Sequence, residues 1–209
     1  MIGYREMITM RKTILIVHGL NGSDGEHWQN KLYNKLLEKG ENVLFPQLPQ
    51  REKPDYNKWK IELENNLKIM KGEKIVICHS MGAFLWIRYS QEKEMIKPDR
   101  IILAAPPSVN EAYLIGKNFE IDKFDLKKLK NSAENLKIVA SNNDHYCVEG
   151  AINTYAISEK IDYDLLSDEA GHINIESGYG EWDSIYNWIY DKNNRITEKE
   201  KGFFFKEAV

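Results

Sequence analysis

The pattern of hydrophobic and polar residues changes its period along the chain. Short, continuous apolar runs, of which Thr13–His18 (TILIVH) is the clearest, alternate with longer segments whose apolar residues recur at helical spacing. A short continuous run is typical of a strand that is buried on both faces, whereas the longer spacing is typical of an amphipathic helix. The chain therefore predicts strands and helices in alternation.

Six segments have the pattern of a strand. They are Thr13–His18, Asn42–Phe45, residues 74–78, Arg100–Ala105, Leu136–Ser141 and Ile161–Leu166. Strands that alternate with helices favour a parallel sheet with helices on both faces. Right-handed crossovers and short connections favour the doubly wound form of that sheet. The predicted fold class is therefore α/β, with three layers and a sheet of about six mostly parallel strands.

Helical segments are predicted between these strands. They are Glu26–Lys39, a stripe from Tyr56 to Met70, residues 83–92, a lysine-rich region around 123–131, Val148–Ser158 and a last helix around Trp182–Ile189. The connection from Pro106 to Asn135 already has to supply a crossover helix, so we expect no cap domain. We place a lead-in at residues 1–12, one domain at 13–191 and a polar tail at 192–209, and leave the position of Phe203–Phe205 in that tail open.

Composition and charge narrow the range of functions. The chain has 209 residues, of which 42% are hydrophobic and 29% charged, as expected for a single globular domain. A net charge of −3 gives no basic footprint and argues against nucleic-acid binding. Two cysteines, Cys78 and Cys147, provide neither a disulfide framework nor metal-binding spacing. The longest aliphatic run, Ile14–Val17, is too short to cross a membrane, and we expect a cytoplasmic protein.

Residues 78–82 (CHSMG) lie at the junction between a predicted strand and a predicted helix. A serine at such a turn, with a small residue two positions before it and glycine two positions after it, matches the nucleophile elbow G-x-S-x-G. Cys78 replaces the first glycine, which we expect to crowd the elbow slightly. A serine here could also simply cap the helix, so the role of Ser80 depends on its partners.

Candidate partners for Ser80 follow other strands. Ligands of doubly wound sheets bind at the carboxyl ends of the strands. Ser80 follows the third strand, Asp144 the fifth and His172 the sixth, which is the chain order of the α/β-hydrolases. We favour Asp144 over the rival Asp168 because it follows the strand where this topology supplies the acid. Of the other four histidines, His79 and His145 are directly adjacent to a candidate residue. His18 belongs to the first loop and His27 to the first helix.

These residues predict a serine nucleophile. His172 would take the proton of Ser80, and Asp144 would orient the imidazole. An oxyanion needs fixed N–H donors, for which we expect Met81 and Leu20, with Asn21 as the alternative to Leu20. The residues expected to contact substrate are Asn21, Pro107, Val109, Tyr146 and Tyr179. We expect no cofactor and no metal, and the expected partner is a small-molecule ester or amide.

Taken together, these motifs resemble the small, lidless serine hydrolases of the retinoblastoma-binding-protein-nine type, a branch of the α/β-hydrolase superfamily. The matching segments are VHGLNGS at 17–23, HW at 27–28, CHSMG at 78–82, SNND at 141–144 and GHINIESGYGEW at 171–182. The resemblance covers residues 13–190 and implies the same triad of Ser80, Asp144 and His172. The L-x-C-x-E motif that binds retinoblastoma protein is not intact, because residues 145–149 read HYCVE. We therefore carry over no such partner from the resemblance, and leave the protein partner open.

Three functions remain open on the sequence. The first is a serine hydrolase that acts on small carboxylic esters or on amides. The second is a catalytically idle α/β-hydrolase fold that serves as a binding protein. The third is a thiol or metal enzyme built from Cys147, His145 and Asp144, whose near-contiguity makes convergence on one ligand difficult.

Overall fold

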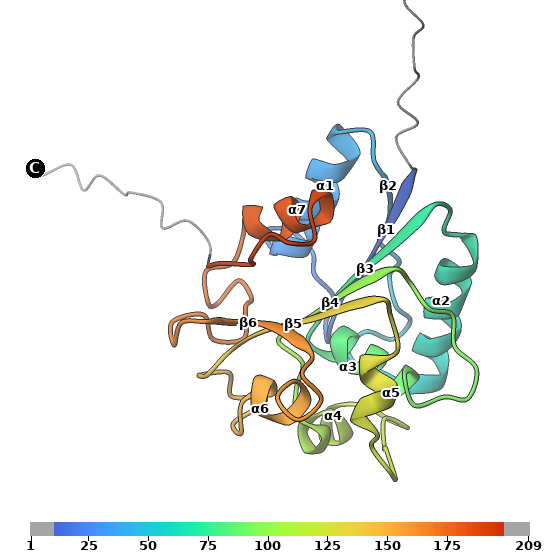
Figure 1. The fold of residues 1–209 in the computed structure, drawn as a ribbon, viewed down its shortest axis with the longest axis vertical. Helices are drawn as coiled ribbons and strands as arrows, with labels where there is room; N and C mark the ends of the chain where they lie inside the picture. The colour runs from blue at the N-terminus through green and yellow to red at the C-terminus, as the bar shows by residue number, and fades with distance from the viewer. Residues whose placement is uncertain (1–10, 199–209) are drawn as a thin grey trace, which may run out of the picture.

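The structure is a computed structural model that describes residues 11–198, and its centre is one six-stranded sheet (Figure 1). The strand order is β2-β1-β3-β4-β5-β6, and every neighbouring pair is parallel. The strands are β1 (Lys12–Val17), β2 (Asn42–Leu44), β3 (Glu73–His79), β4 (Arg100–Ala104), β5 (Asn135–Ser141) and β6 (Asp162–Leu166). The predicted fold class is confirmed, because the chain reverses direction across the sheet at β1 and β3 in the doubly wound manner.

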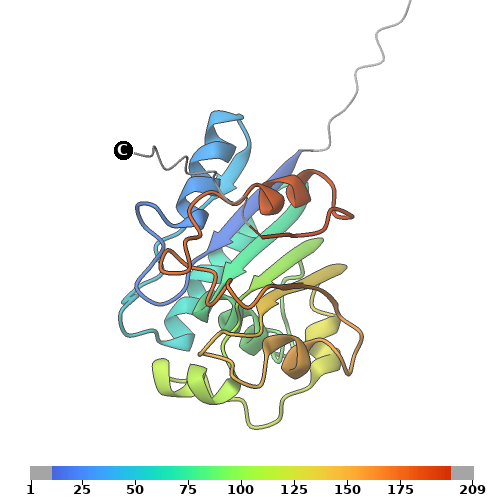
Figure 2. The ribbon, with the colours of Figure 1, turned by 90° about the vertical axis from the view of Figure 1, so that its left-hand side faces the viewer.

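Helices cover both faces of this sheet (Figures 1 and 2). Two of them lie on one face, α1 (Trp28–Glu38) and α7 (Asp183–Tyr190). The other face carries α2 (Tyr56–Ile69), α3 (Met81–Tyr89), α4 (Val109–Ile115), α5 (Leu126–Lys130) and α6 (Ala151–Tyr155). Within residues 11–198 no cap domain stands over the carboxyl ends of the strands. In that range, no helix has both the length and the apolar character needed to cross a bilayer.

Two apolar layers result from the alternation of side chains along the strands. Ile75 and Ile77 belong to the layer that contains Trp28 of α1. Val76 and Cys78 belong to the opposite layer, with the side chains of α2 and α3. Cys78 is only 1% exposed, so the cysteine at the elbow fills core space as a small apolar side chain.

Several element boundaries differ from the sequence expectation. The first helix begins at Trp28 rather than Glu26, because the His27 side chain caps it by accepting the Gln29 N–H at 3.2 Å. Helix α6 is shorter than the helix predicted over Val148–Ser158. It begins after Gly150, whose φ of 79° is outside the helical range. The connection after β4 contains two short helices where we expected one lysine-rich helical region.

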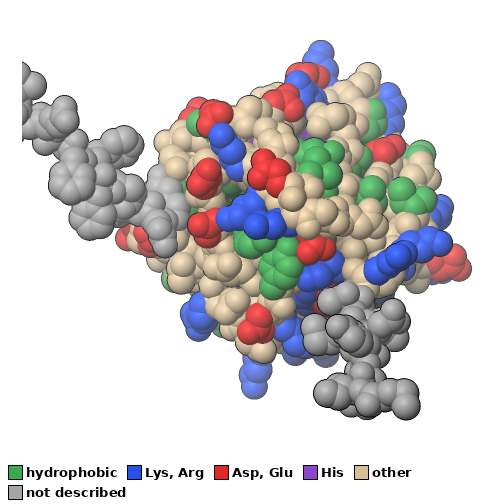
Figure 3. Space-filling view, turned by 90° about the horizontal axis from the view of Figure 1, so that it is seen from above, with side chains coloured by type: hydrophobic (Ala, Val, Ile, Leu, Met, Phe, Trp, Pro, Cys, Tyr) green, Lys and Arg blue, Asp and Glu red, His purple; other side chains and the backbone are tan. Residues whose placement is uncertain are grey.

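The part of the predicted tail that the structure describes, residues 192–198, lies against the domain. Ile196 is buried, and its N–H donates to Asp164 on β6 at 2.9 Å. The indole N–H of Trp182 donates to the Thr197 carbonyl at 2.7 Å. Phe203–Phe205 lie outside the described residues. On the surface, the described side chains of both charge signs are interspersed over the face seen in Figure 3.

Candidate active site

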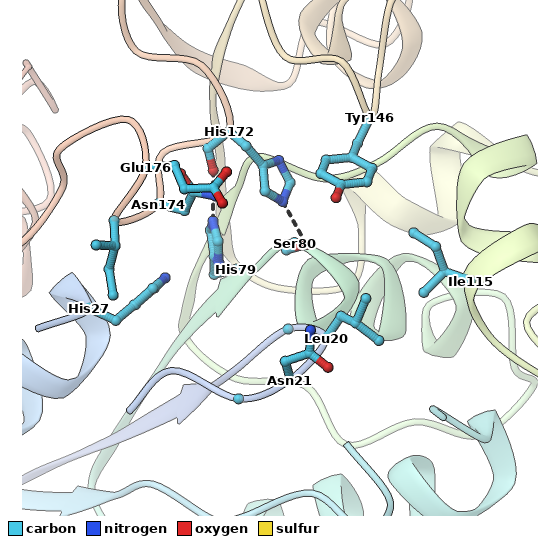
Figure 4. A pocket seen from close by; sticks show the side chains of 13 residues that line it. Leu20, Asn21, His27, His79, Ser80, Ile115, Tyr146, His172, Asn174 and Glu176 are labelled. Carbon is cyan, nitrogen blue, oxygen red and sulfur yellow. Dashed lines mark hydrogen bonds between the residues drawn. The ribbon is translucent and has the colours of Figure 1, made fainter. Parts of the chain in front are cut away.

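The structure brings Ser80, His172 and Asp144 together at the carboxyl edge of the sheet. His172 Nε2 lies 2.8 Å from Ser80 Oγ, and His172 Nδ1 lies 2.8 Å from Asp144 Oδ2. Figure 4 shows the imidazole directed at the serine. Asp144 is buried, and its other carboxylate oxygen accepts the Tyr146 N–H at 3.0 Å. The rival acid Asp168 is exposed in the turn after β6, so the geometry favours Asp144.

Ser80 has a backbone conformation that few residues adopt. Its φ is 54° and its ψ is −126°, and its side chain makes no capping hydrogen bond to α3. Positive φ at a non-glycine residue costs free energy and persists only where the surrounding structure enforces it. The hydroxyl points into the site, and the interpretation of Ser80 as a simple helix cap is wrong.

Glycines on both sides enforce this conformation. A Cβ added to Gly82 would collide with the His18 carbonyl oxygen and lie 2.7 Å from the Val17 carbonyl oxygen, both of which are backbone atoms of the neighbouring strand and loop. A Cβ on Gly19 would lie 2.7 Å from the Ser80 Cβ. The elbow and the loop after β1 therefore pack so closely that each needs glycine at the contact.

The loop after β1 limits which of its N–H groups is free to face a substrate. The Asn21 N–H donates to the Arg51 carbonyl at 3.0 Å and is not available. Within the described residues the Leu20 N–H has no protein acceptor, which favours Leu20. Met81 is the first residue of α3, and the first N–H groups of a helix lack partners inside that helix. Leu20 and Met81 remain the candidate donors.

His18 holds this loop in place. Its Nε2 accepts the Leu48 N–H at 2.9 Å, so its Nδ1 carries the proton and donates to the Gly19 carbonyl at 2.7 Å. Burial is the main cause that lowers the pKa of His18. The imidazole is therefore neutral, and its two hydrogen bonds hold the loop in position.

The loop that carries His172 is held by side chains from distant segments. His79 Nε2 donates to the His172 carbonyl at 2.9 Å, and Trp28 Nε1 donates to the Ile173 carbonyl at 2.9 Å. Ser141 Oγ donates to the Gly171 carbonyl at 2.6 Å. Burial lowers the pKa of His79 well below its usual value, which keeps that ring neutral. Sequence reasoning assigned no such role to His79 or Trp28, because only the folded chain brings them to this loop.

A pocket of about 300 Å³ opens above Ser80. Two of the predicted substrate contacts, Asn21 and Tyr146, line it, as does Leu20, the expected oxyanion donor. Besides Ser80 and His172, the other side chains that line the pocket were not expected from the sequence: His27, His79, Ile115, Asn174, Ile175 and Glu176. The Tyr146 ring packs on the His172 ring with centroids 4.5 Å apart, which places an aromatic wall beside the base.

Three predicted substrate contacts do not line the pocket, and those predictions are corrected. Tyr179 is 1% exposed and packs against Trp182 in the core under α7. Pro107 is buried, with its carbonyl accepting the Tyr155 hydroxyl at 2.7 Å. Val109 packs against the core at the start of α4. Pro107 and Val109 follow the end of β4 and Tyr179 lies in the glycine-rich segment after His172, but all three residues are buried or pack against the core.

The structure gives no support to a thiol or metal site. Burial raises the pKa of Cys147 to about 11, which disfavours the thiolate that such chemistry needs. The Asp144 carboxylate already accepts a hydrogen bond from His172. No group of three or more histidine, cysteine or acidic side chains among residues 11–198 could hold a metal ion.

Comparisons with known proteins identify the family and the fold of the chain. A family model described as serine hydrolase matches residues 14–191. The curated protein YdeN of Bacillus subtilis (strain 168) is 25% identical over 138 residues, which are 65% of this chain and 72% of that protein. The crystal structure of the ydeN gene product from B. subtilis has a TM-score of 0.71 at 21% identity and covers 86% of this chain and 97% of its own. The esterase domain from a Rhodothermus marinus protein has a TM-score of 0.60 at 12% identity and covers 90% of both chains.

Proposed function

The chain belongs to the serine hydrolase family, and on that premise we propose that it cleaves small carboxylic esters, and amides more slowly, through an acyl-enzyme on Ser80. The observation that carries the proposal is the hydrogen-bonded series Asp144–His172–Ser80, with both distances at 2.8 Å. An idle binding protein has no need to keep all three groups aligned. The narrower resemblance to the retinoblastoma-binding-protein-nine type stays a prediction.

The proposed reaction begins with proton transfer. His172 Nδ1–H donates to Asp144, which leaves Nε2 as the base that takes the Ser80 proton. Ser80 Oγ attacks the ester carbonyl, and the N–H groups of Leu20 and Met81 bind the resulting oxyanion. His172 then gives its proton to the leaving alcohol oxygen as the ester C–O bond breaks. Water, deprotonated by the same imidazole, then attacks the acyl carbon; the bond from that carbon to Ser80 Oγ breaks, and His172 returns the proton to Oγ as the acid leaves.

The size of the pocket supports short acyl groups. A volume of about 300 Å³ has to hold both ends of the substrate, and no cap covers the site within the described residues. Each buried methylene contributes about 0.8 kcal/mol. Methylenes beyond the end of the apolar surface stay in water. Lengthening the acyl chain past the first few carbons therefore adds no binding free energy.

A chain-length series with a Ser80→Ala control tests the proposal. We expect kcat/KM on p-nitrophenyl esters to level off or fall beyond short acyl chains. The Ser80→Ala protein should retain the fold and lose activity by several orders of magnitude, as triad losses do. Undiminished activity in the alanine variant would refute the nucleophile. A steady rise through octanoate to palmitate would instead refute the small substrate.

A further inference from the structure

The pocket has two sides of different chemistry. In Figure 4 the Ser80–His172 pair lies in the middle of the opening. One side presents the side chains of Leu20, Ile115 and Tyr146, with Asn21 beside Leu20, and the other presents His27, Asn174 and Glu176. A substrate that fills the whole pocket therefore needs one largely apolar part and one part that forms hydrogen bonds.

His27 is a hydrogen-bond donor fixed in advance on the polar side. Its Nδ1 accepts the Gln29 N–H at the start of α1, so the proton of the neutral ring is on Nε2. The ring nitrogen farther from the backbone points toward the pocket in Figure 4, and among the described residues the one hydrogen bond of the ring is the one that Nδ1 accepts. The side chain is held in place at 6% exposure.

The protonation state of His27 decides what it can bind. Burial, together with the nearby His172 and His18, lowers the pKa of His27 to about 4. The ring is therefore uncharged at neutral pH and offers one N–H. Such a group suits an uncharged acceptor, such as a hydroxyl or ether oxygen.

Two residues of the His172 loop complete the polar side. The amide oxygen of Asn174 accepts the Ser177 N–H at 3.0 Å, which leaves its NH₂ group as a donor. Glu176, exposed at the rim, adds a carboxylate acceptor. Donors and an acceptor around one small space match hydroxyl groups, because each hydroxyl both donates and accepts.

The reaction orients the substrate between the two sides. His172 must protonate the leaving oxygen, and the loop that continues from His172 carries the polar groups. The candidate oxyanion donor Leu20 lies on the apolar side, next to the acyl carbon. Building on the proposed esterase function, we propose that the polar side binds a polyhydroxylated alcohol as leaving group, a glycerol or sugar hydroxyl, and that His27 selects it by donating from Nε2. The acyl group then occupies the side of Leu20 and Ile115.

Two acetate esters of equal carbon number in the alcohol test this directly: glycerol monoacetate and n-propyl acetate. The wild-type protein should have the higher kcat/KM on glycerol monoacetate. His27→Asn keeps a good helix cap but is too short to reach the pocket. We expect this variant to lower kcat/KM for glycerol monoacetate five- to tenfold more than for propyl acetate, the size of one neutral hydrogen bond.

Ile115→Ala is the matched control on the apolar side. It should change kcat/KM for both acetates by the same factor and alter the preference between acetyl and butyryl esters. If His27→Asn lowered kcat/KM equally on both acetates, the assignment of His27 would be overturned. The same holds if the loss in kcat/KM depended on the acyl group and not on the alcohol. A wild-type protein that hydrolyses neither of these acetates nor p-nitrophenyl acetate would refute the esterase function itself.

Discussion

The elbow that carries Ser80 and the loop that carries His172 are fixed in different ways. Steric contact holds the elbow, because Gly82 and Gly19 leave no room for a side chain against the backbone of the neighbouring segment. Hydrogen bonds hold the histidine loop, with donors from His79, Trp28 and Ser141. The elbow depends on close packing against one segment, the end of β1 and the loop after it, while the histidine loop depends on side-chain donors from three separate segments. A change in the elbow should therefore affect folding, and a change around the loop should affect the position of the base.

The largest expected effect comes from the acid at the end of the histidine series. Asp144→Asn should lower kcat by about 10⁴-fold, because an amide favours the wrong imidazole tautomer, as in the serine proteases for which this magnitude is known. Asp168→Asn, at an exposed turn, should change kcat by less than about threefold. Steady-state kinetics on p-nitrophenyl acetate compare the two variants. If Asp168→Asn were the more damaging, the acid would have to be reassigned.

Gly82→Ala probes the steric side of the comparison. The new methyl group would meet two backbone carbonyl oxygens that cannot move without distorting β1 and its loop. We expect the free energy of unfolding to fall by about 3 kcal/mol, in the range of overpacking in a dense core. Gly180→Ala is the control, since its Cβ would meet only the Glu26 carbonyl at 3.3 Å. Equal stability of both variants in urea denaturation would show that the elbow is not sterically fixed.

Acid should destabilise the fold through its buried histidines. The unfolded chain takes up protons at each histidine near pH 6.5, whereas the folded state keeps His27 neutral down to about pH 4. Above pH 6.5 both states are neutral, so stability is lost as pH falls from about 6.5 toward 4. His27 alone should account for about 2 kcal/mol at pH 5, and His79 and His18 act in the same direction. His27→Asn should flatten the dependence of unfolding free energy on pH, and an unchanged slope would contradict the buried neutral state.

The smallest expected effect concerns the hydrogen bond that His79 makes to the His172 carbonyl. His79→Phe fills the space but removes the donor, and we expect kcat to fall about tenfold, the equivalent of about 1.4 kcal/mol. His79→Gln retains an N–H donor and should recover most of the loss. A purely structural role would lower stability in both variants without this rescue of kcat.

The sequence predicted most of the fold, and it predicted that Ser80, Asp144 and His172 would lie together, because each of these signals is contained in a short segment. The strand runs and helical stripes set the layers, and the CHSMG segment carries its own elbow signal. The pocket walls were harder to predict, because His27 and Ile115 reach the pocket only through the packing of α1 and α4. Tyr179 was misplaced for the same reason, since an aromatic residue near a glycine-rich loop can turn inward to the core as readily as outward to a ligand.

Covalent labelling with a fluorophosphonate tests the central claim most directly. The folded protein should gain the mass of one probe, and peptide mapping should find it on Ser80, because only a serine activated by His172 attacks phosphorus at neutral pH. The folded Ser80→Ala protein should gain no mass. Labelling of that variant at the same rate, or no labelling of a folded wild-type protein, would contradict the assignment of Ser80 as an activated nucleophile.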